Sequence, residues 1–149
     1  MANKLIVFSC IGFIFFACSK NKEKVKTETN TSFQQVYEMS EMALLMEKMY
    51  DELEQKRKLI IEEKSIGEYP VEFNKIHTAE MTSSFERTEE YNRLANLYLQ
   101  NLKLLYESKN TDLNRIELYN NVVKSCLTCH RSDAGCIGPV DRIGKLLID

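Results

Sequence analysis

The chain has 149 residues, of which 28% are charged and 44% hydrophobic, and its formal net charge at pH 7 is −2. Because acidic and basic residues nearly balance, the composition gives no sign of the basic surface that nucleic-acid binding requires. The chain contains only five Gly and two Pro, so few residues interrupt long regular segments.

The first segment is predicted to be an export signal. Residues 1–4 are short and basic, and residues 5–17 are nearly all apolar. Because this run is shorter than the roughly 20 residues of a spanning helix, we interpret residues 1–17 as a signal peptide. The sequence Phe-Phe-Ala-Cys at residues 15–18 resembles a bacterial lipobox. The resemblance implies that Cys18 is lipidated; ordinary cleavage nearby and an uncleaved anchor are the alternatives.

Residues 18–32 are predicted to form a lipid-anchored, disordered tether. After Cys18 they are Lys, Asn, Glu, Thr and Ser with almost nothing apolar, and such a segment buries too little apolar surface to fold. Residues 33–149 suffice for one domain with one core. No second long apolar run occurs. We therefore expect an envelope protein that faces the periplasm or is held in the outer membrane as a lipoprotein.

The domain is predicted to be all-α, a four-helix-bundle-like fold with a short second helix. From Phe33 to about Lys64 no Gly or Pro occurs. Apolar residues recur there at spacings of three and four, as in an amphipathic helix. Gly67 stands where this helix would end, and Pro70 suits the first turn of a short second helix. The first apolar stripe consists of Met39, Met42, Met46, Met49, Leu53 and Ile60.

Two further long helices are expected. Ser83 and Glu86 form a capping-box pattern before the first of them, whose apolar face is Tyr91, Leu94, Ala95, Tyr98, Leu102 and Leu105. A turn at residues 109–111 precedes the last helix, with Thr111 or Asp112 as its N-cap. The apolar face of that helix is Ile116, Tyr119, Val123, Cys126 and His130. We interpret the tyrosines of both helices as packing residues.

The last long helix carries the motif Cys126-Leu127-Thr128-Cys129-His130. Two cysteines at this spacing with a histidine directly after them are typical of a c-type haem attachment site. On a helix, Cys126 and Cys129 face one edge of the macrocycle and can add to its vinyl groups, and His130 shares that face and can bind the iron. We therefore predict one haem c per chain, held by this C-terminal helix inside the bundle.

A CxxC pair also occurs in zinc sites and in thiol redox sites. A zinc site needs further ligands, for which the chain offers only His77 and Cys136. A thioredoxin-like pair follows a strand in a βαβ unit, and we find no such unit in the pattern. With Cys10 in the signal and Cys18 lipidated, Cys136 has no intramolecular disulfide partner, and we interpret it as a small thiol near the haem edge.

A helical bundle with CxxCH near the end of its last helix resembles the class II c-type cytochromes, the cytochrome c-prime family. Residues 44–50 and 136–143 further resemble a lipoprotein branch of small exported cytochromes from Bacteroidetes-type bacteria. The resemblance implies that His130 is the proximal iron ligand and that the first helix forms the distal side. The chain departs from the family in its short second helix and in the nineteen residues (149 − 130) that follow His130.

The resemblance leaves the sixth iron ligand open. Relatives with a methionine on the first helix are six-coordinate electron carriers, and relatives with an apolar residue there stay five-coordinate and bind NO or CO. We favour Met46 as the distal ligand, with Met42 as second choice and His77 as a remote candidate. We expect Arg142 and Lys145 either to pair with the haem propionates or to remain solvated surface charges.

The predicted function is electron transfer, with redox proteins of the envelope as partners and the lipid anchor as the contact with the membrane. The alternative is a five-coordinate haem protein that binds gases for sensing or protection. We expect no enzyme, because no acid–base or nucleophile constellation appears outside the haem motif. The resemblance also implies a possible homodimer formed through the first two helices. The short second helix weakens this implication for the present chain.

Overall fold

The computed structural model describes residues 38–133 and 138–149. All of them belong to one compact unit, residues 36–149. The predicted signal peptide and tether, together with Cys10, Cys18 and Cys136, lie outside the described residues. Within the described ranges, no helix combines the length and the apolar composition needed to cross a bilayer.

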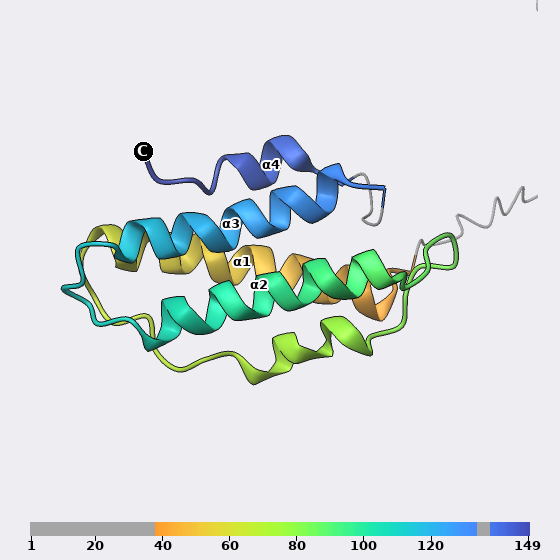
Figure 1. Ribbon diagram of the computed structural model, residues 1–149, viewed down its shortest axis with the longest axis horizontal. Helices are drawn as coiled ribbons and strands as arrows, with labels where there is room; N and C mark the ends of the chain where they lie inside the picture. The colour runs from red at the N-terminus through yellow and green to blue at the C-terminus, as the bar shows by residue number, and fades with distance from the viewer. Residues whose placement is uncertain (1–37, 134–137) are drawn as a thin grey trace, which may run out of the picture. The chain divides into compact units, whose positions relative to one another are not determined.

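Three long helices form the body of the domain: α1 (Glu41–Ile61), α2 (Glu89–Glu107) and α3 (Arg115–Arg131). In Figure 1, α1 and α2 run in the same direction and α3 runs in the opposite one. A 3₁₀ helix, η1 (Val71–His77), lies beside α2, and the short helix α4 (Val140–Gly144) lies along α3. The prediction of an all-α fold is confirmed.

A regular four-helix bundle is not confirmed. In the described ranges, the position expected for the second helix holds only the seven-residue 3₁₀ segment η1. The chain beyond the CxxCH motif adds a further short helix, α4, which packs against α3. The haem-motif helix is therefore the last long helix of the described chain, but not its last helix.

The ends of α1 differ from those predicted. Ser40 is the N-cap, and its Oγ accepts a hydrogen bond from the N–H of Ala43 at 3.1 Å, so the described residues before Glu41 are not helical. The helix ends at Ile61 in a Schellman motif. Glu63 adopts a left-handed conformation with φ 52°, and the N–H of Lys64 donates to the carbonyl of Leu59 at 2.8 Å. Gly67, predicted as the stop signal, lies beyond this turn.

Both predicted caps of the later helices are wrong. The N-cap of α2 is Thr88, whose Oγ1 accepts from the N–H of Tyr91 at 3.0 Å, and not the Ser83–Glu86 pair. The N-cap of α3 is Asn114, and not Thr111 or Asp112. Asp112 instead accepts the N–H of Lys109 at 2.8 Å and closes the turn between the helices. The start of α2 is thus marked by a side-chain cap bond, whereas Asn114 makes no side-chain cap bond at the start of α3.

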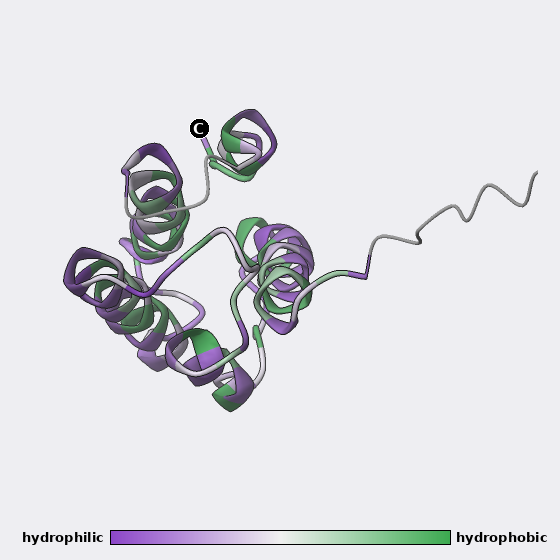
Figure 2. Cartoon of the chain, turned by 90° about the vertical axis from the view of Figure 1, so that its right-hand side faces the viewer, coloured by the Kyte–Doolittle hydropathy of each residue, from purple (hydrophilic) through white to green (hydrophobic). Residues whose placement is uncertain are grey.

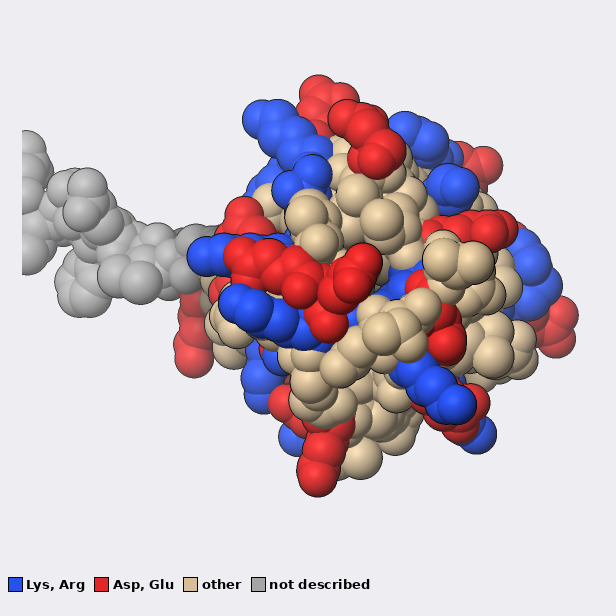
Figure 3. Space-filling view, turned by 90° about the vertical axis from the view of Figure 1, so that its left-hand side faces the viewer, with Lys and Arg blue, Asp and Glu red and all other residues tan. Residues whose placement is uncertain are grey.

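The apolar face predicted for α2 is confirmed in full, because all six of its residues are buried. On α1, Met46 is only partly buried, and Leu45, which the prediction omitted, is buried. On α3, Tyr119 and Val123 are buried as predicted, whereas Ile116 is 41% exposed. Figure 2 shows the hydrophobic residues of the helices turned mainly towards the space that they enclose. On the face in Figure 3, acidic and basic side chains are interspersed, in line with the near-balanced charge.

Candidate functional site

A pocket opens between α1, α2, α3 and α4, with η1 at one side. It holds about 100 Å³ of cavity volume and is open at one side. Leu53, Leu94 and Ala95 are among the apolar side chains of its walls, and Ile143 and Leu146 are others. The site is therefore a mostly apolar cavity.

The last two turns of α3 form one wall of this pocket. Cys126, Cys129 and His130 all line it, and each is partly buried. Both cysteines are thiols and take part in no disulfide. The structure thus brings the three motif residues that the sequence analysis selected to the same cavity.

Neighbouring groups hold this wall in place and change its chemistry. Burial raises the pKa of the Cys126 thiol to about 12, and negative charge at Cys129 adds to the shift. One turn before Cys129, the Oγ of Ser125 donates to the carbonyl of Asn121 at 2.8 Å and accepts from Nδ2 of Asn101 at 2.7 Å. Because Asn101 lies on α2, this polar link fixes α3 against α2 beside Cys126.

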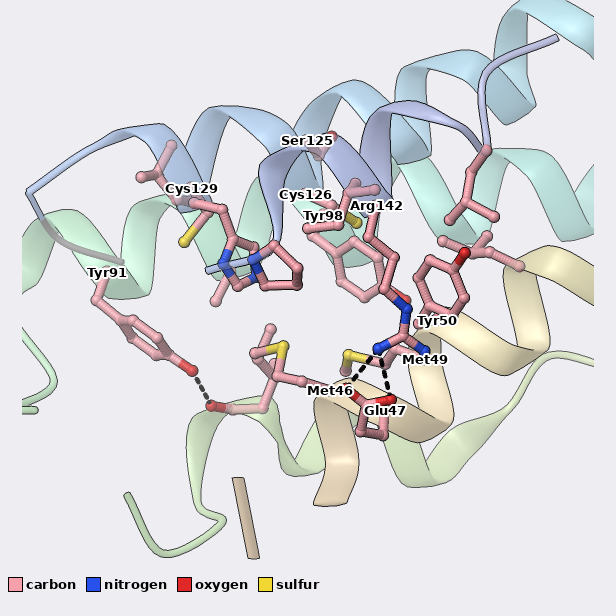
Figure 4. Close-up of a pocket in the computed structure, with 18 residues that line it drawn as sticks. Met46, Glu47, Met49, Tyr50, Tyr91, Tyr98, Ser125, Cys126, Cys129 and Arg142 are labelled. Atoms are coloured by element: carbon pink, nitrogen blue, oxygen red, sulfur yellow. Dashed lines mark hydrogen bonds and ion pairs between the residues drawn. The ribbon is translucent and has the colours of Figure 1, made fainter. Parts of the chain in front are cut away.

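The opposite wall comes from α1. Figure 4 shows Met46 and Met49 on this side and Cys126 and Cys129 on the α3 side. Met46 was the favoured distal residue; Met49 was on the predicted stripe but was not chosen. Its position three residues after Met46 on the same helical face was the signal that could have identified it.

The other two distal candidates lie outside the pocket lining. Met42 is buried, and its Sδ lies 3.7 Å from the hydroxyl of Tyr91. His77 ends η1, where its Nδ1 lies 3.3 Å from Oδ1 of Asn92. Neither residue is among those that line the cavity, so Met46 and Met49 are the thioethers that the structure places there.

Helix α4 forms a further wall and is joined to α1 by a group that we call the Arg142 clasp, made of Arg142, Glu47 and Tyr50. Nη1 of Arg142 donates to both carboxylate oxygens of Glu47 at 2.8 Å, and the guanidinium lies 3.8 Å from the ring centroid of Tyr50 (Figure 4). Hydrogen bonding to Glu47 raises the pKa of Arg142. Arg142 and Lys145 were the two cations considered for contacts with the haem propionates. Arg142 lines the pocket and is paired with Glu47, whereas Lys145 is exposed and does not line the pocket.

The segment after α4 is anchored at the far side of the pocket. The guanidinium of Arg57 donates to the carbonyls of Leu146 and Leu147 at 3.2–3.4 Å. The side-chain amide of Asn120 both donates to the carbonyl of Ile148 and accepts its N–H, at 2.8 and 2.9 Å. These bonds tie the chain end to α1 and α3 and keep Leu146 on the pocket.

The described residues hold no cluster of three or more His, Cys, Asp or Glu side chains placed to bind a metal ion. Cys136, which the zinc alternative would need, lies outside the described residues. Around the CxxC pair, the described chain therefore offers two thiols and one imidazole on an apolar cavity.

Comparison with known proteins finds no match for this chain among family models, curated proteins or solved structures.

Proposed function

We propose that this protein is a monohaem c-type cytochrome of the class II type that transfers electrons on the exported side of the membrane. The observation that carries the proposal is that Cys126, Cys129 and His130, on one helix, line a single apolar pocket. An isolated CxxC pair would support several chemistries, but this combination supports haem attachment.

The residues present fit a haem. Cys126 and Cys129 supply the two thiols for thioether bonds, and His130 supplies an axial nitrogen for the iron. The apolar side chains of α1, α2 and α4 lower the dielectric constant around a bound haem, which tunes an iron potential. When bound, the haem supplies one-electron chemistry between ferric and ferrous iron.

Two thioethers on the wall opposite the motif favour electron transfer over gas binding. Met46 is the proposed distal ligand, and Met49 is the second residue within the pocket. Methionine ligation raises the iron potential and suits an electron carrier. It also occupies the position that a gas would need.

The proposed location and partners rest on the predicted lipid anchor and on the predicted haem. A lipidated Cys18 would hold the domain at the membrane of the cell envelope. Redox proteins of the envelope are the proposed partners, in the small and short-lived encounters typical of electron transfer.

The test of attachment is mass spectrometry of the chain produced in a host with c-type haem maturation. We expect the mass of one covalent haem on the wild type, weaker retention after Cys126→Ala or Cys129→Ala, and none after both. Cys136→Ala is the matched control, because it removes a cysteine outside the CxxCH motif, and we expect it to keep the haem. Unmodified thiols without haem on the wild type would overturn the proposal.

The test of the distal side is the spectrum of the same protein. A low-spin spectrum with a methionine–iron charge-transfer band supports the electron carrier. A high-spin spectrum that changes strongly with CO would replace electron transfer by the gas-binding alternative.

A further inference from the structure

The tyrosines of the described chain differ in how their hydroxyls are satisfied. Tyr119 donates to the carbonyl of Leu53 at 3.1 Å, and Tyr106 donates to Glu52 at 2.8 Å. Tyr91 donates to the carbonyl of Ile76 at 2.9 Å. Buried hydroxyls nearly always have such a partner, because leaving one unpaired costs free energy.

Tyr98 is the exception among them. Its side chain is 4% exposed, and its hydroxyl has no hydrogen-bond partner among the described residues. Burial raises the pKa of this phenol well above its ordinary value, with negative charge at Cys126 as the next cause. Tyr98 therefore keeps its proton and remains a hydrogen-bond donor at any physiological pH.

The position of Tyr98 connects this hydroxyl to the site. Tyr98 lies on α2 and lines the pocket together with Cys126 of α3 (Figure 4). The other buried side-chain atoms without a partner belong to Arg87 and Arg115, and neither residue is part of the pocket lining. Among the described residues, Tyr98 is thus the pocket-lining residue that has a buried hydroxyl without a hydrogen-bond partner.

We infer that Tyr98 is a binding residue whose hydroxyl donates a hydrogen bond to an acceptor atom of the group held in this pocket. The inference rests on the proposed function, so that group is the haem together with its iron ligands. Two sources of the acceptor share this chemistry: an atom of the haem or of its protein ligand, and an atom of a small molecule bound to the iron. In either case the bound group completes a hydrogen bond that the protein lacks by itself.

The test compares two tyrosine-to-phenylalanine variants of the haem-loaded full chain. Tyr98→Phe keeps the ring that packs in the core and removes only the unpaired hydroxyl. Tyr119→Phe is the matched control, because it removes a buried hydroxyl that already donates to the protein and is not part of the pocket lining. We expect the control to lower the melting temperature and to leave the haem spectrum and potential unchanged.

For Tyr98→Phe, we expect the haem spectrum, the potential or the CO complex to change, and the melting temperature to change little. A shift of the absorption bands and of the midpoint potential without added gas would place the acceptor on the haem or its protein ligand. If these stay constant, and the C–O stretch of the CO complex moves to higher frequency, the acceptor is the iron-bound molecule. Both results support the inference.

A loaded Tyr98→Phe protein that matches the wild type in spectrum, potential and C–O stretch would overturn the inference, because Tyr98 would then serve packing alone. That result would leave the proposed function intact. A wild-type chain without covalent haem would instead overturn the proposed function and this inference with it.

Discussion

The first half of α3 packs into a filled core, whereas its second half lines the pocket. Tyr119, Val122 and Val123 are completely buried. One turn later, Cys126 is only partly buried and lines the pocket. The helix and its spacing of apolar positions are the same in both halves, so the difference comes from what the other helices place opposite.

The comparison separates stability from chemistry along one helix. Leu102 and Leu105 of α2 belong to the same core cluster as these residues and are also completely buried. The second half faces Met46 and Met49 across a cavity. We therefore expect substitutions in the filled half to change the free energy of unfolding, and substitutions at the pocket to change the bound group.

The sharpest expected effect is an all-or-none change in iron coordination after Met46→Ala. If Met46 is the distal ligand, its loss converts a low-spin ferric spectrum to high-spin, lowers the potential and opens the iron to CO. Met42→Ala is the control: Met42 is buried but does not line the pocket, so it should act as a cavity substitution without a spectral change. A switch seen in Met49→Ala alone would move the ligand to Met49.

The next effect concerns the reactivity of Cys126 in the folded chain produced without haem maturation. Burial raises the pKa of its thiol to about 12, so the reactive thiolate at pH 8 is much rarer than in the unfolded chain. Alkylation followed by peptide mass mapping should be slow at pH 8, faster as the pH rises, and fast at pH 8 in guanidinium. Equal rates in the folded and unfolded chain would show that the second half of α3 does not bury this thiol.

A core truncation tests the filled half. Leu105→Ala removes a completely buried side chain, and we expect it to lower the free energy of unfolding by about 2–5 kcal/mol in denaturant titrations. Leu104→Ala, at the neighbouring position that is 52% exposed, should stay within about 0.5 kcal/mol. Similar values for both variants would contradict the view that this half carries the stability.

The smallest effect is expected from the Arg142 clasp. Arg142→Gln removes the ion pair with Glu47. The side chains of Arg142 and Glu47 are 41% and 45% exposed, so the melting temperature should fall only slightly, and the difference from the wild type should shrink in high salt. Arg93→Gln, which breaks the exposed pair with Glu90 on α2, is the matched control within one helix. A clasp variant that destabilises as much as Leu105→Ala would mean that this ion pair, and not the buried Ile143 of α4, holds the helix in place.

Much of this architecture could be predicted from the local spacing of residues in the sequence. The α2 face was predictable because its apolar residues keep a regular spacing of three and four, and the CxxCH motif was recognisable because its ligands are adjacent in sequence. Helix caps were not predictable, because several Ser, Thr, Asn and Asp residues before each helix compete for the cap position. The contact of Arg142 with Glu47 joins residues 95 positions apart, which no local pattern encodes. The unpaired hydroxyl of Tyr98 depends on its whole surroundings, so sequence periodicity identified it only as a packing residue.

The wall formed by α4 is held differently from the other walls, and this has a consequence for the order in which parts of the molecule open. α4 is a five-residue helix, and side-chain bonds of Arg142, Arg57 and Asn120 attach it and the segment after it. A segment with so few backbone hydrogen bonds of its own opens at a lower free energy than the long helices that it covers. In hydrogen exchange, the amides of α4 should therefore lose protection while those of α2 and α3 remain protected, so that one side of the pocket opens to solvent before the fold is lost.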